Sequence, residues 1–293
     1  MEQSFDLHTH TMHSDGTLRP SALVRLAARR GIGLAVTDHD SVEGVAEALE
    51  AGRRIGVTIL PGIELSVGYK GREAHILGLF VDHEHAGLVR RMAEIKAGRY
   101  ARATETLRRL SELGYPLAWR DFSRRPWNAP SISLHLIRAL AAAGIIQEDE
   151  GEAFKEEYLA PGAPAHVPRV RVDPEEAVSL ISSAGGVPVL AHPGWIPKGV
   201  DTRELIALGM EGLEAFHPEH GAEDCERLVE LAREHGLLVT GGSDYHGHGT
   251  PGEPDLGAIA TPLSDVLEIA RRARSGFARG FLTRHSHSWL SRM

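Results

Sequence analysis

The chain has 293 residues, 42% of them hydrophobic and 25% charged, which are ordinary values for one large globular domain or a domain with an insertion. Its formal net charge of -8 argues against general electrostatic attraction to nucleic acid, but it leaves room for a local basic groove. The single cysteine, Cys225, excludes an internal disulfide. No signal peptide and no apolar run of about 18 residues is recognisable, so we expect a cytoplasmic protein without a membrane span. Nothing in the sequence implies a protein partner.

The first motif follows a short predicted strand at residues 4–7. His8 and His10 are two residues apart, so in an extended backbone both imidazoles point to the same side and can bind one cation. Asp15, in a predicted turn, adds a carboxylate of the kind that manganese, zinc and iron sites combine with imidazole. For this segment taken alone, a solvated polar terminus is the alternative interpretation.

Helix and strand patterns alternate after this motif. The helical patterns cover residues 20–30, 42–54, 174–184, 202–208, 222–235 and 263–275, and the strand patterns cover 33–36, 57–60, 74–80, 187–191, 212–216, 237–240 and 257–260. Such alternation favours parallel pairing with right-handed crossovers. In a closed barrel of this kind, the carboxyl ends of the strands meet at one rim.

Residues 98–167 interrupt the alternation. A long charged helix, predicted from about residue 85 to 114, is followed by helical patterns over 131–143 and 148–158 and by a linker rich in Pro and Gly. We therefore predict a helical insertion, or cap, over residues 98–167, within a barrel domain formed by residues 1–97 and 168–293.

Histidines and carboxylates occur at six successive predicted strand ends. A lone histidine in an apolar strand, such as His75, is more often a hydrogen-bonded core residue, but charged groups at a barrel mouth need partners that offset their desolvation. Two or three metal ions about 3.5–4 Å apart would supply such partners, bind phosphoryl oxygens and activate a bridging hydroxide. Phosphoester hydrolysis is therefore the predicted chemistry. The candidate residues are His8, His10, Asp15, Asp38, His39, Asp40, Glu64, His75, His192, His217, Asp244 and His246.

The order of these motifs resembles that of the polymerase-and-histidinol-phosphatase (PHP) superfamily. The motifs are His8-Thr9-His10, Ser14-Asp15-Gly16, Thr37-Asp38-His39-Asp40, Pro61-Gly62-Ile63-Glu64, His75, Ala191-His192-Pro193 and Gly242-Ser243-Asp244-Tyr245-His246. The resemblance spans nearly the whole chain and implies a distorted (β/α)7 barrel, an α/β fold, with a helical insertion. That insertion resembles the branch of nucleoside 3',5'-bisphosphate phosphatases, AMP-type phosphoesterases and 5'-to-3' exoribonucleases.

The resemblance also implies a set of metal ligands. One ion would bind His8, His10, Glu64 and Asp244, a second would bind Glu64, His75 and His192, and a third would bind Asp15, His39 and His246. Glu64 would then bridge two ions. The implied cofactors are two or three divalent ions, with manganese as the first choice and iron or zinc as alternatives, and mixed imidazole and carboxylate donors suit these ions better than calcium or magnesium.

Three further residues are predicted to support catalysis. Asp38 or Asp40 would orient a ligand imidazole or a water. His217 follows its predicted strand, and we interpret it as the acid that protonates the leaving alkoxide, with an exposed loop histidine as the alternative interpretation. His220 is a second candidate acid.

The insertion contains the candidate substrate-binding residues. Arg124 and Arg125 lie close to Asn128 and an aromatic residue, a combination that could bind phosphate and stack a base, although a solvated basic loop is the alternative. Many family members have Gly-Arg-Pro-His where this chain has Ile132-Ser133-Leu134-His135, so serine replaces the arginine of the family motif. The predicted contacts are Arg124, Arg125, Asn128, His135 and Arg138; Trp119, Trp195 and Trp289 are interpreted as packing residues.

These patterns predict a metal-dependent phosphoesterase that acts on nucleotides, either a 3',5'-bisphosphate, an AMP-like monophosphate or the 5' end of short RNA. Histidinol phosphatase and cyclic-phosphate phosphodiesterase are alternatives with the same chemistry. A metal-dependent amidohydrolase would need a lysine at a strand end, where the sequence has none. A non-catalytic metal-binding accessory module would be expected to have lost ligands, whereas every expected ligand position is filled.

We predict that Arg124→Ala and Arg125→Ala raise KM more than they lower kcat, because they would remove binding that is equal in the ground state and the transition state. Steady-state kinetics on the substrate tests this. Unchanged constants would remove both arginines from the site.

Overall fold

The computed structural model describes residues 3–120, 132–169, 171–196 and 201–290. The chain divides into two compact units, Met1–Arg91 with Val172–Met293, and Met92–Arg171. The first unit contains the strands and the second is helical. The division falls within helix α3 (Ala86–Glu112), so a single helix leaves one unit and enters the other.

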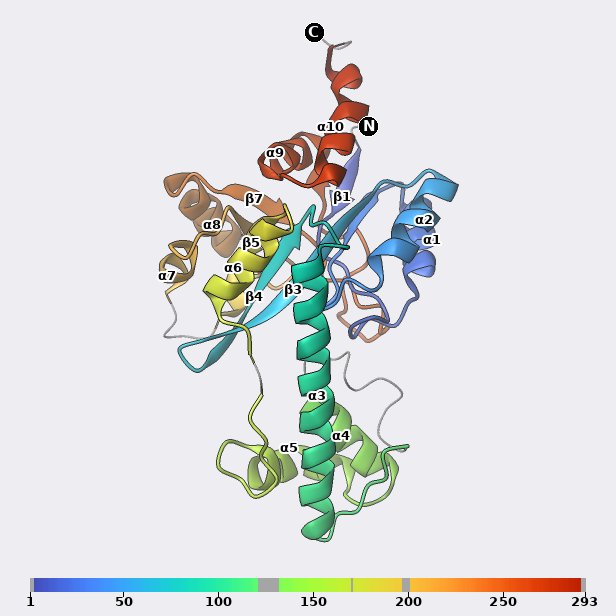
Figure 1. Ribbon diagram of the computed structural model, residues 1–293, viewed down its shortest axis with the longest axis vertical. Helices are drawn as coiled ribbons and strands as arrows, with labels where there is room; N and C mark the ends of the chain where they lie inside the picture. The colour runs from blue at the N-terminus through green and yellow to red at the C-terminus, as the bar shows by residue number, and fades with distance from the viewer. Residues whose placement is uncertain (1–2, 121–131, 170, 197–200, 291–293) are drawn as a thin grey trace. The chain divides into compact units, whose positions relative to one another are not determined.

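The described strands form one eight-stranded sheet in the order β7-β6-β5-β4-β3-β2-β1-β8 (Figure 1). They are β1 (Ser4–Asp6), β2 (Gly33–Val36), β3 (Ile59–Tyr69), β4 (Arg72–Leu79), β5 (Val187–Leu190), β6 (Gly212–Phe216), β7 (Leu238–Gly241) and β8 (Thr261–Pro262). At the two ends of this order, Thr261 Oγ1 accepts the Gly241 amide and donates to the Gly241 carbonyl oxygen, each at 3.0 Å. The sheet is thus nearly closed, and the predicted distorted barrel is confirmed.

The expected parallel pairing is wrong for β8, which is antiparallel to β1, and for β4, which is antiparallel to both of its neighbours. Lys70 and Gly71, at φ 48° and 76°, connect β3 to β4 as a two-residue hairpin, so there is no crossover helix between these strands. Because β4 runs in the opposite direction, its amino end lies beside the carboxyl half of β3, where His75 pairs with Ser66. This reversal carries His75 to the end of the sheet that also holds Glu64.

Helices surround the sheet in the first unit (Figure 1). They are α1 (Pro20–Arg30), α2 (Val45–Ile55), α6 (Pro174–Ser183), α7 (Thr202–Ile206), α8 (Ala222–Glu234), α9 (Leu263–Arg272) and α10 (Gly276–Leu290). Proline at the first position of α1 and the left-handed Gly31 after its last residue explain its predicted bounds. None of the described helices is long and apolar enough to cross a membrane.

Helix α10 was not predicted, because Gly276, Gly280 and a run of His and Ser are poor helix formers. Its Phe281 is fully buried and contacts Phe5 and Phe80 edge-on, at ring centroid distances of 6.2 and 5.3 Å. Burial of such a side chain stabilises the fold by roughly 1.5–3 kcal/mol and so offsets part of the weak helix propensity. Tertiary packing therefore determines this helix.

The second unit has its own hydrophobic core. Besides most of α3 it contains α4 (Ile132–Ala142) and a continuous helical segment made of η2 (Glu148–Glu150), α5 (Gly151–Phe154) and the π-helical turn η3 (Lys155–Leu159). Leu110, Leu140 and Phe154 are buried together in this core. Arg102 and Arg109 of α3 donate to the carbonyl oxygens of Val167 and His166, which fixes the last residues of the unit to that helix.

Asp6 connects the loops at the closing end of the sheet. Its fully buried carboxylate accepts hydrogen bonds from the Ser243 amide at 2.9 Å, the Ser243 hydroxyl, the Gly257 amide at 2.8 Å and the His8 amide at 3.3 Å. Burial raises the pKa of Asp6 to about 6 in spite of these donors.

We predict that Asp6→Asn lowers the free energy of unfolding by about 1–3 kcal/mol at pH 8, where the native carboxylate is ionised, because the new amide group cannot accept all these bonds. Urea unfolding in the presence of a chelator measures the change. The control is Asp255→Asn, which removes an exposed ion pair with Arg30 and should cost less than about 1 kcal/mol. Equal effects of the two changes would contradict the role given to Asp6.

Candidate metal centre

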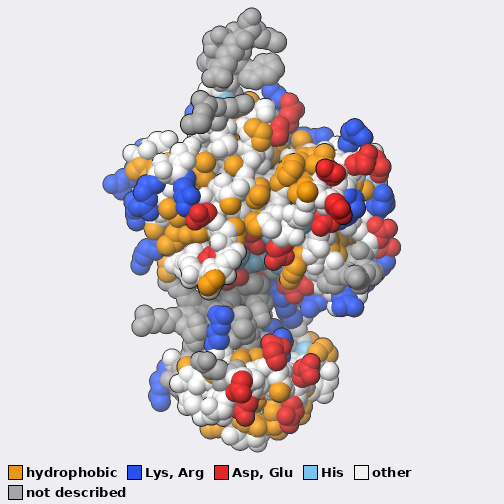
Figure 2. Space-filling view, turned by 180° about the vertical axis from the view of Figure 1, so that it is seen from behind, with side chains coloured by type: hydrophobic (Ala, Val, Ile, Leu, Met, Phe, Trp, Pro, Cys, Tyr) orange, Lys and Arg blue, Asp and Glu red, His pale blue; other side chains and the backbone are white. Residues whose placement is uncertain are grey.

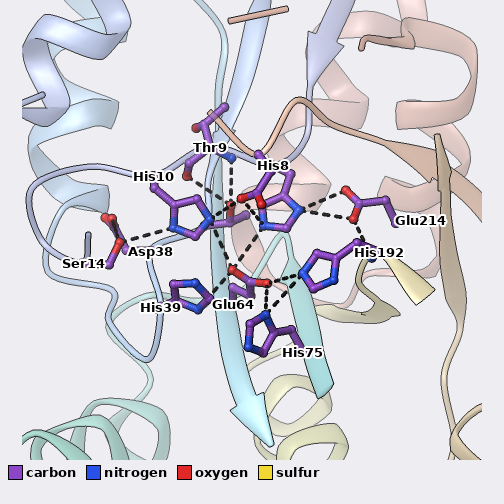
Figure 3. A network of polar contacts seen from close by, with 12 residues as sticks. His8, Thr9, His10, Ser14, Asp38, His39, Glu64, His75, His192 and Glu214 are labelled. Carbon is purple, nitrogen blue, oxygen red and sulfur yellow. Dashed lines mark hydrogen bonds and ion pairs between the residues drawn. The ribbon is translucent and has the colours of Figure 1, made fainter. Parts of the chain in front are cut away.

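Loops at one end of the barrel, together with β3 and β4, supply the candidate metal ligands (Figure 3). Isolated bridges continue the sheet pairing beyond the strand ends, between Thr9 and Tyr245 and between His39 and Glu64. The His10 amide donates to the Tyr245 carbonyl oxygen at 2.9 Å. Because the backbone stays extended there, His8 and His10 point to the same side, as predicted from their spacing, with ring centroids 5.2 Å apart.

Glu64 lies at the centre of the cluster and is 1% exposed. Its two carboxylate oxygens face five imidazoles (Figure 3). Oε2 lies 3.2 Å from His8 Nε2, 3.2 Å from His10 Nε2 and 3.1 Å from His39 Nδ1, and Oε1 lies 3.0 Å from His75 Nδ1 and 3.1 Å from His192 Nε2.

Two further carboxylates complete the donor set. Asp244 Oδ1 lies 3.3 Å from His8 Nε2 and 3.0 Å from His10 Nε2. Asp15 Oδ1 lies 3.2 Å from His246 Nε2, and Asp15 Oδ2 lies 3.9 Å from His39 Nε2. The structure thus brings every predicted metal ligand into one cluster.

Hydrogen bonds on the far side of several rings determine which nitrogen faces the cluster. His8 Nδ1 lies 3.0 Å from Glu214 Oε1, and His246 Nδ1 lies 2.7 Å from the Asp244 carbonyl oxygen. Since these oxygens can only accept, Nδ1 carries the proton in each neutral ring and the lone pair is on Nε2. In His75 the two nitrogens have exchanged roles. Nε2 lies 3.3 Å from Glu73 Oε1 and carries the proton of the neutral ring, so the lone pair is on Nδ1, which faces Glu64.

This arrangement fits bound cations. Lone pairs of neutral imidazoles would repel carboxylate oxygens about 3 Å away, whereas the same spacing of about 3.0–3.4 Å separates ligands that share an ion at about 2.1 Å. Several of the facing atoms are buried and have no hydrogen-bond partner among the described residues. They are His8 Nε2, His10 Nε2, Asp15 Oδ1, His39 Nδ1, Glu64 Oε2 and Asp244 Oδ1.

The electrostatics of the cluster favour positive charge inside it. Burial alone lowers the pKa of His10 and His75, but Asp244 and Glu64 raise the pKa of His10 to about 10, and Glu64 raises that of His75 to about 9. Burial opposes charge on Glu64 as well, yet the imidazoles around it that hold a proton, among them His8 and His75, keep its pKa well below the usual range. The carboxylates that stabilise protons here would equally stabilise a divalent cation.

His39 does not belong to one set of ligands alone. Burial lowers its pKa to about 3, so the neutral ring offers a lone pair. Its Nδ1 faces Glu64 while its Nε2 faces Asp15, and it therefore lies between the two groups. The groups with close donor atoms are His8, His10, Glu64 and Asp244; His39, Glu64 and His75; His10, Asp15, His39 and His246; and His8, Glu214 and His217.

The two other predicted carboxylates lie outside these groups. Asp38 accepts the amide and hydroxyl of Thr11, each at 2.7 Å, and the Ser14 hydroxyl at 2.7 Å. Ser14 Oγ in turn lies 3.3 Å from His10 Nδ1, so Asp38 can orient His10 through Ser14 (Figure 3). Asp40, at φ 46°, accepts the Ser66 amide at 2.9 Å and thereby supports β3.

The two candidate acids have different surroundings. His217 is buried, with Nε2 3.6 Å from Asp244 Oδ2, while its Nδ1 accepts the Glu219 amide at 3.2 Å. Both nitrogens of His220 are used by backbone groups, since Nδ1 bonds the Ala215 carbonyl oxygen at 2.9 Å and Nε2 accepts the Gly194 amide at 3.1 Å. His217 therefore faces the cluster, and His220 has a structural role.

The sequence patterns did not single out Glu214. This fully buried carboxylate on β6 contacts His8 Nδ1 and accepts the His192 amide at 2.8 Å, so it positions ligands of two proposed metal sites. The available signal was a glutamate between the apolar residues Leu213 and Ala215 in the predicted strand, where a buried charge needs partners.

The predicted substrate-binding residues are placed only in part. Arg124, Arg125 and Asn128 lie outside the described residues, as does the side chain of His135. Arg138 lies on α4 with an exposed side chain. Their contacts with substrate stay predictions.

We predict that Glu64→Gln lowers the bound metal substantially while the fold is kept, because the variant keeps the size of the side chain but loses the charge shared by two donor groups. Metal analysis by mass spectrometry after gel filtration measures the change, with Glu219→Gln on the same rim as the control. A Glu64→Gln protein with full metal content would contradict the bridging position.

We also predict that Glu214→Gln weakens metal affinity by about 10- to 100-fold, because groups that orient a ligand imidazole typically contribute that much. Titration with Mn²⁺, followed by the paramagnetic resonance of the free ion, gives the affinity. An affinity equal to that of Glu219→Gln would show that Glu214 does not position His8 or His192.

Known proteins resemble this chain over most of its length. It is 35% identical over 277 residues to the 3',5'-nucleoside bisphosphate phosphatase of Chromobacterium violaceum, and the alignment covers 90% of this chain and 96% of that protein. It is 34% identical over 252 residues to the 5'-3' exoribonuclease of Haemophilus influenzae, and this alignment covers 84% of this chain and 91% of that protein.

A solved structure from Bifidobacterium adolescentis, assigned as a metal-dependent phosphoesterase, matches with a TM-score of 0.77 at 32% identity and covers 94% of this chain and 98% of that one. Residues 6–117 match the PHP domain. These similarities confirm the predicted hydrolase class as well as the predicted fold. The chain belongs to the PHP family of metal-dependent phosphoesterases.

Proposed function

We propose that this phosphoesterase hydrolyses phosphate esters of nucleotides, with a nucleoside 3',5'-bisphosphate or an AMP-like monophosphate as substrate. The observation that carries the proposal is the 35% identity with a nucleoside bisphosphate phosphatase over 96% of that protein's length. The exoribonuclease relative supports a second candidate, the removal of nucleotides from the 5' end of short RNA.

The described charges on one face of the molecule favour the smaller substrate. On the face seen in Figure 2, the described Lys and Arg side chains are interspersed with Asp and Glu. Long nucleic acids are bound mainly through rows of basic side chains along the phosphate backbone. A substrate with one or two phosphates needs only local contacts, which metal ions bound by the cluster of proposed ligands would provide.

The residues of the cluster suit this chemistry. The proposed ligands are His8, His10, Asp15, His39, Glu64, His75, His192, Asp244 and His246, which would hold two or three divalent ions, manganese, iron or zinc. Such ions, when bound, lower the pKa of water and neutralise phosphoryl oxygens. Glu214 and the pair Asp38 and Ser14 would keep the imidazoles oriented through the reaction.

His217 would serve as a hydrogen-bond donor to the reacting phosphate. Because its Nδ1 accepts the Glu219 amide, the proton of the neutral ring is on Nε2, which faces Asp244. An Nε2 proton in that position can stabilise charge on a phosphoryl or leaving oxygen. A proton transfer to the leaving alkoxide, as the sequence pattern suggests, would need a proton on Nδ1 as well, where the ring already accepts the hydrogen bond of the Glu219 amide.

The test is to incubate manganese-loaded protein with adenosine 3',5'-bisphosphate, AMP, a 5'-phosphorylated RNA oligomer and a five-membered cyclic phosphate, and to separate the products by chromatography. Phosphate release from the small nucleotides is the expected result. Stepwise shortening of the oligomer from its 5' end, with little turnover of small nucleotides, would favour the exonuclease. Turnover of the cyclic phosphate alone would refute the proposal. Glu64→Gln serves as the inactive control.

We predict that His217→Ala lowers kcat by about 10²- to 10³-fold with little change in metal content, because it removes a donor that acts on charge in the transition state. Kinetics together with metal analysis checks this, with the exposed His235→Ala as a matched control. Loss of metal in His217→Ala would instead identify His217 as a ligand.

A further inference from the structure

Trp195 is an exposed aromatic side chain beside the proposed metal ligands. It ends the short 3-10 helix η4 (Pro193–Trp195), which directly follows His192. Its ring centroid lies 5.6 Å from that of His75 and 5.5 Å from that of His192. Half of the residue, 50%, remains exposed. The expectation that Trp195 is a packing residue therefore leaves the exposure of half of the residue unexplained.

The backbone before Trp195 is held in an unusual conformation. His192 has φ 26° and ψ 59°, a region that side-chain-bearing residues rarely occupy. The Trp195 amide donates to the His192 carbonyl oxygen at 2.9 Å, which closes the turn. Strain of this kind persists only where the surroundings enforce it, and it is concentrated at functional sites.

His220 is part of those surroundings. Its ring is fixed by the Ala215 carbonyl oxygen on β6, and its Nε2 accepts the Gly194 amide. A Cβ atom at Gly194 would lie 2.6 Å from His220 Cδ2, so only glycine fits between the histidine and the turn. The fold thus uses a buried histidine and a glycine to place an indole at the edge of the metal centre, where half of the residue stays exposed.

We propose that Trp195 stacks on the base of the nucleotide whose phosphate binds at the metal centre, and so selects substrates that carry a base. The inference rests on the proposed function. An aromatic ring stacks on any base because every base has a π face. The contact adds no charge beside a centre that already holds many charged groups. The indole lies beside two ligand imidazoles, and the exposed half of the residue is available to the base.

The test compares Trp195→Ala and Trp195→Phe with the parent on adenosine 3',5'-bisphosphate and on its base-free counterpart, ribose 3,5-bisphosphate. For the nucleotide, Trp195→Ala should raise KM about 5- to 100-fold, the range that corresponds to the loss of one stacked base, and leave kcat within about twofold. Trp195→Phe should restore most of the affinity. The KM for the base-free compound should be the same in all three proteins.

Metal content and melting temperature of each variant show whether the centre and the fold are intact. Trp195→Phe remains informative if Trp195→Ala does not fold. An unchanged KM for the nucleotide in Trp195→Ala, or an equal rise for both compounds, would overturn the inference. Failure of the proposed function is a separate result, because the parent enzyme would then release no phosphate from the nucleotide.

Discussion

The organisation of this site depends on one buried carboxylate that is surrounded by imidazoles. Glu64 is 1% exposed, and five ring nitrogens lie 3.0–3.2 Å from its oxygens. A charge removed from water in this way is costly unless positive partners surround it. Such partners must come from strands far apart in the sequence, so the barrel has to bring their ends together. The reversal of β4 serves the same constraint, because it delivers His75 to Glu64 from the opposite chain direction.

A second layer of hydrogen bonds makes the donor set directional. Glu214 holds His8 and the His192 amide, and Asp38 reaches His10 through Ser14. Without these contacts each imidazole could turn its protonated nitrogen towards the carboxylates and form ordinary hydrogen bonds. With them, the lone pairs of the neutral imidazoles face carboxylate oxygens, an arrangement that bound cations stabilise. Residues outside the proposed ligand set thus orient the proposed ligands.

Much of this could be predicted from local sequence, and the remainder depends on tertiary contacts. Two local patterns indicated both the barrel and the metal ligands. One is the pair His8 and His10, two residues apart after a strand, and the other is the series of polar motifs at successive strand ends. The hairpin at Lys70 and Gly71 could not be distinguished from a crossover, because periodicity carries no strand direction. Glu214 was missed because it lies inside an otherwise apolar strand and its partner His8 is distant in sequence. Helix α10 exists because Phe281 packs on the barrel core, which no local pattern reports.

The most direct test of the central claim is the anomalous scattering of crystals grown with Mn²⁺, measured at the manganese absorption edge. The account predicts separate peaks on the two sides of the Glu64 carboxylate, one also within bonding distance of His8, His10 and Asp244, and the other of His75. A metal centre without Glu64 as a ligand, or protein that binds no Mn²⁺ and keeps its full phosphoesterase activity, would contradict it.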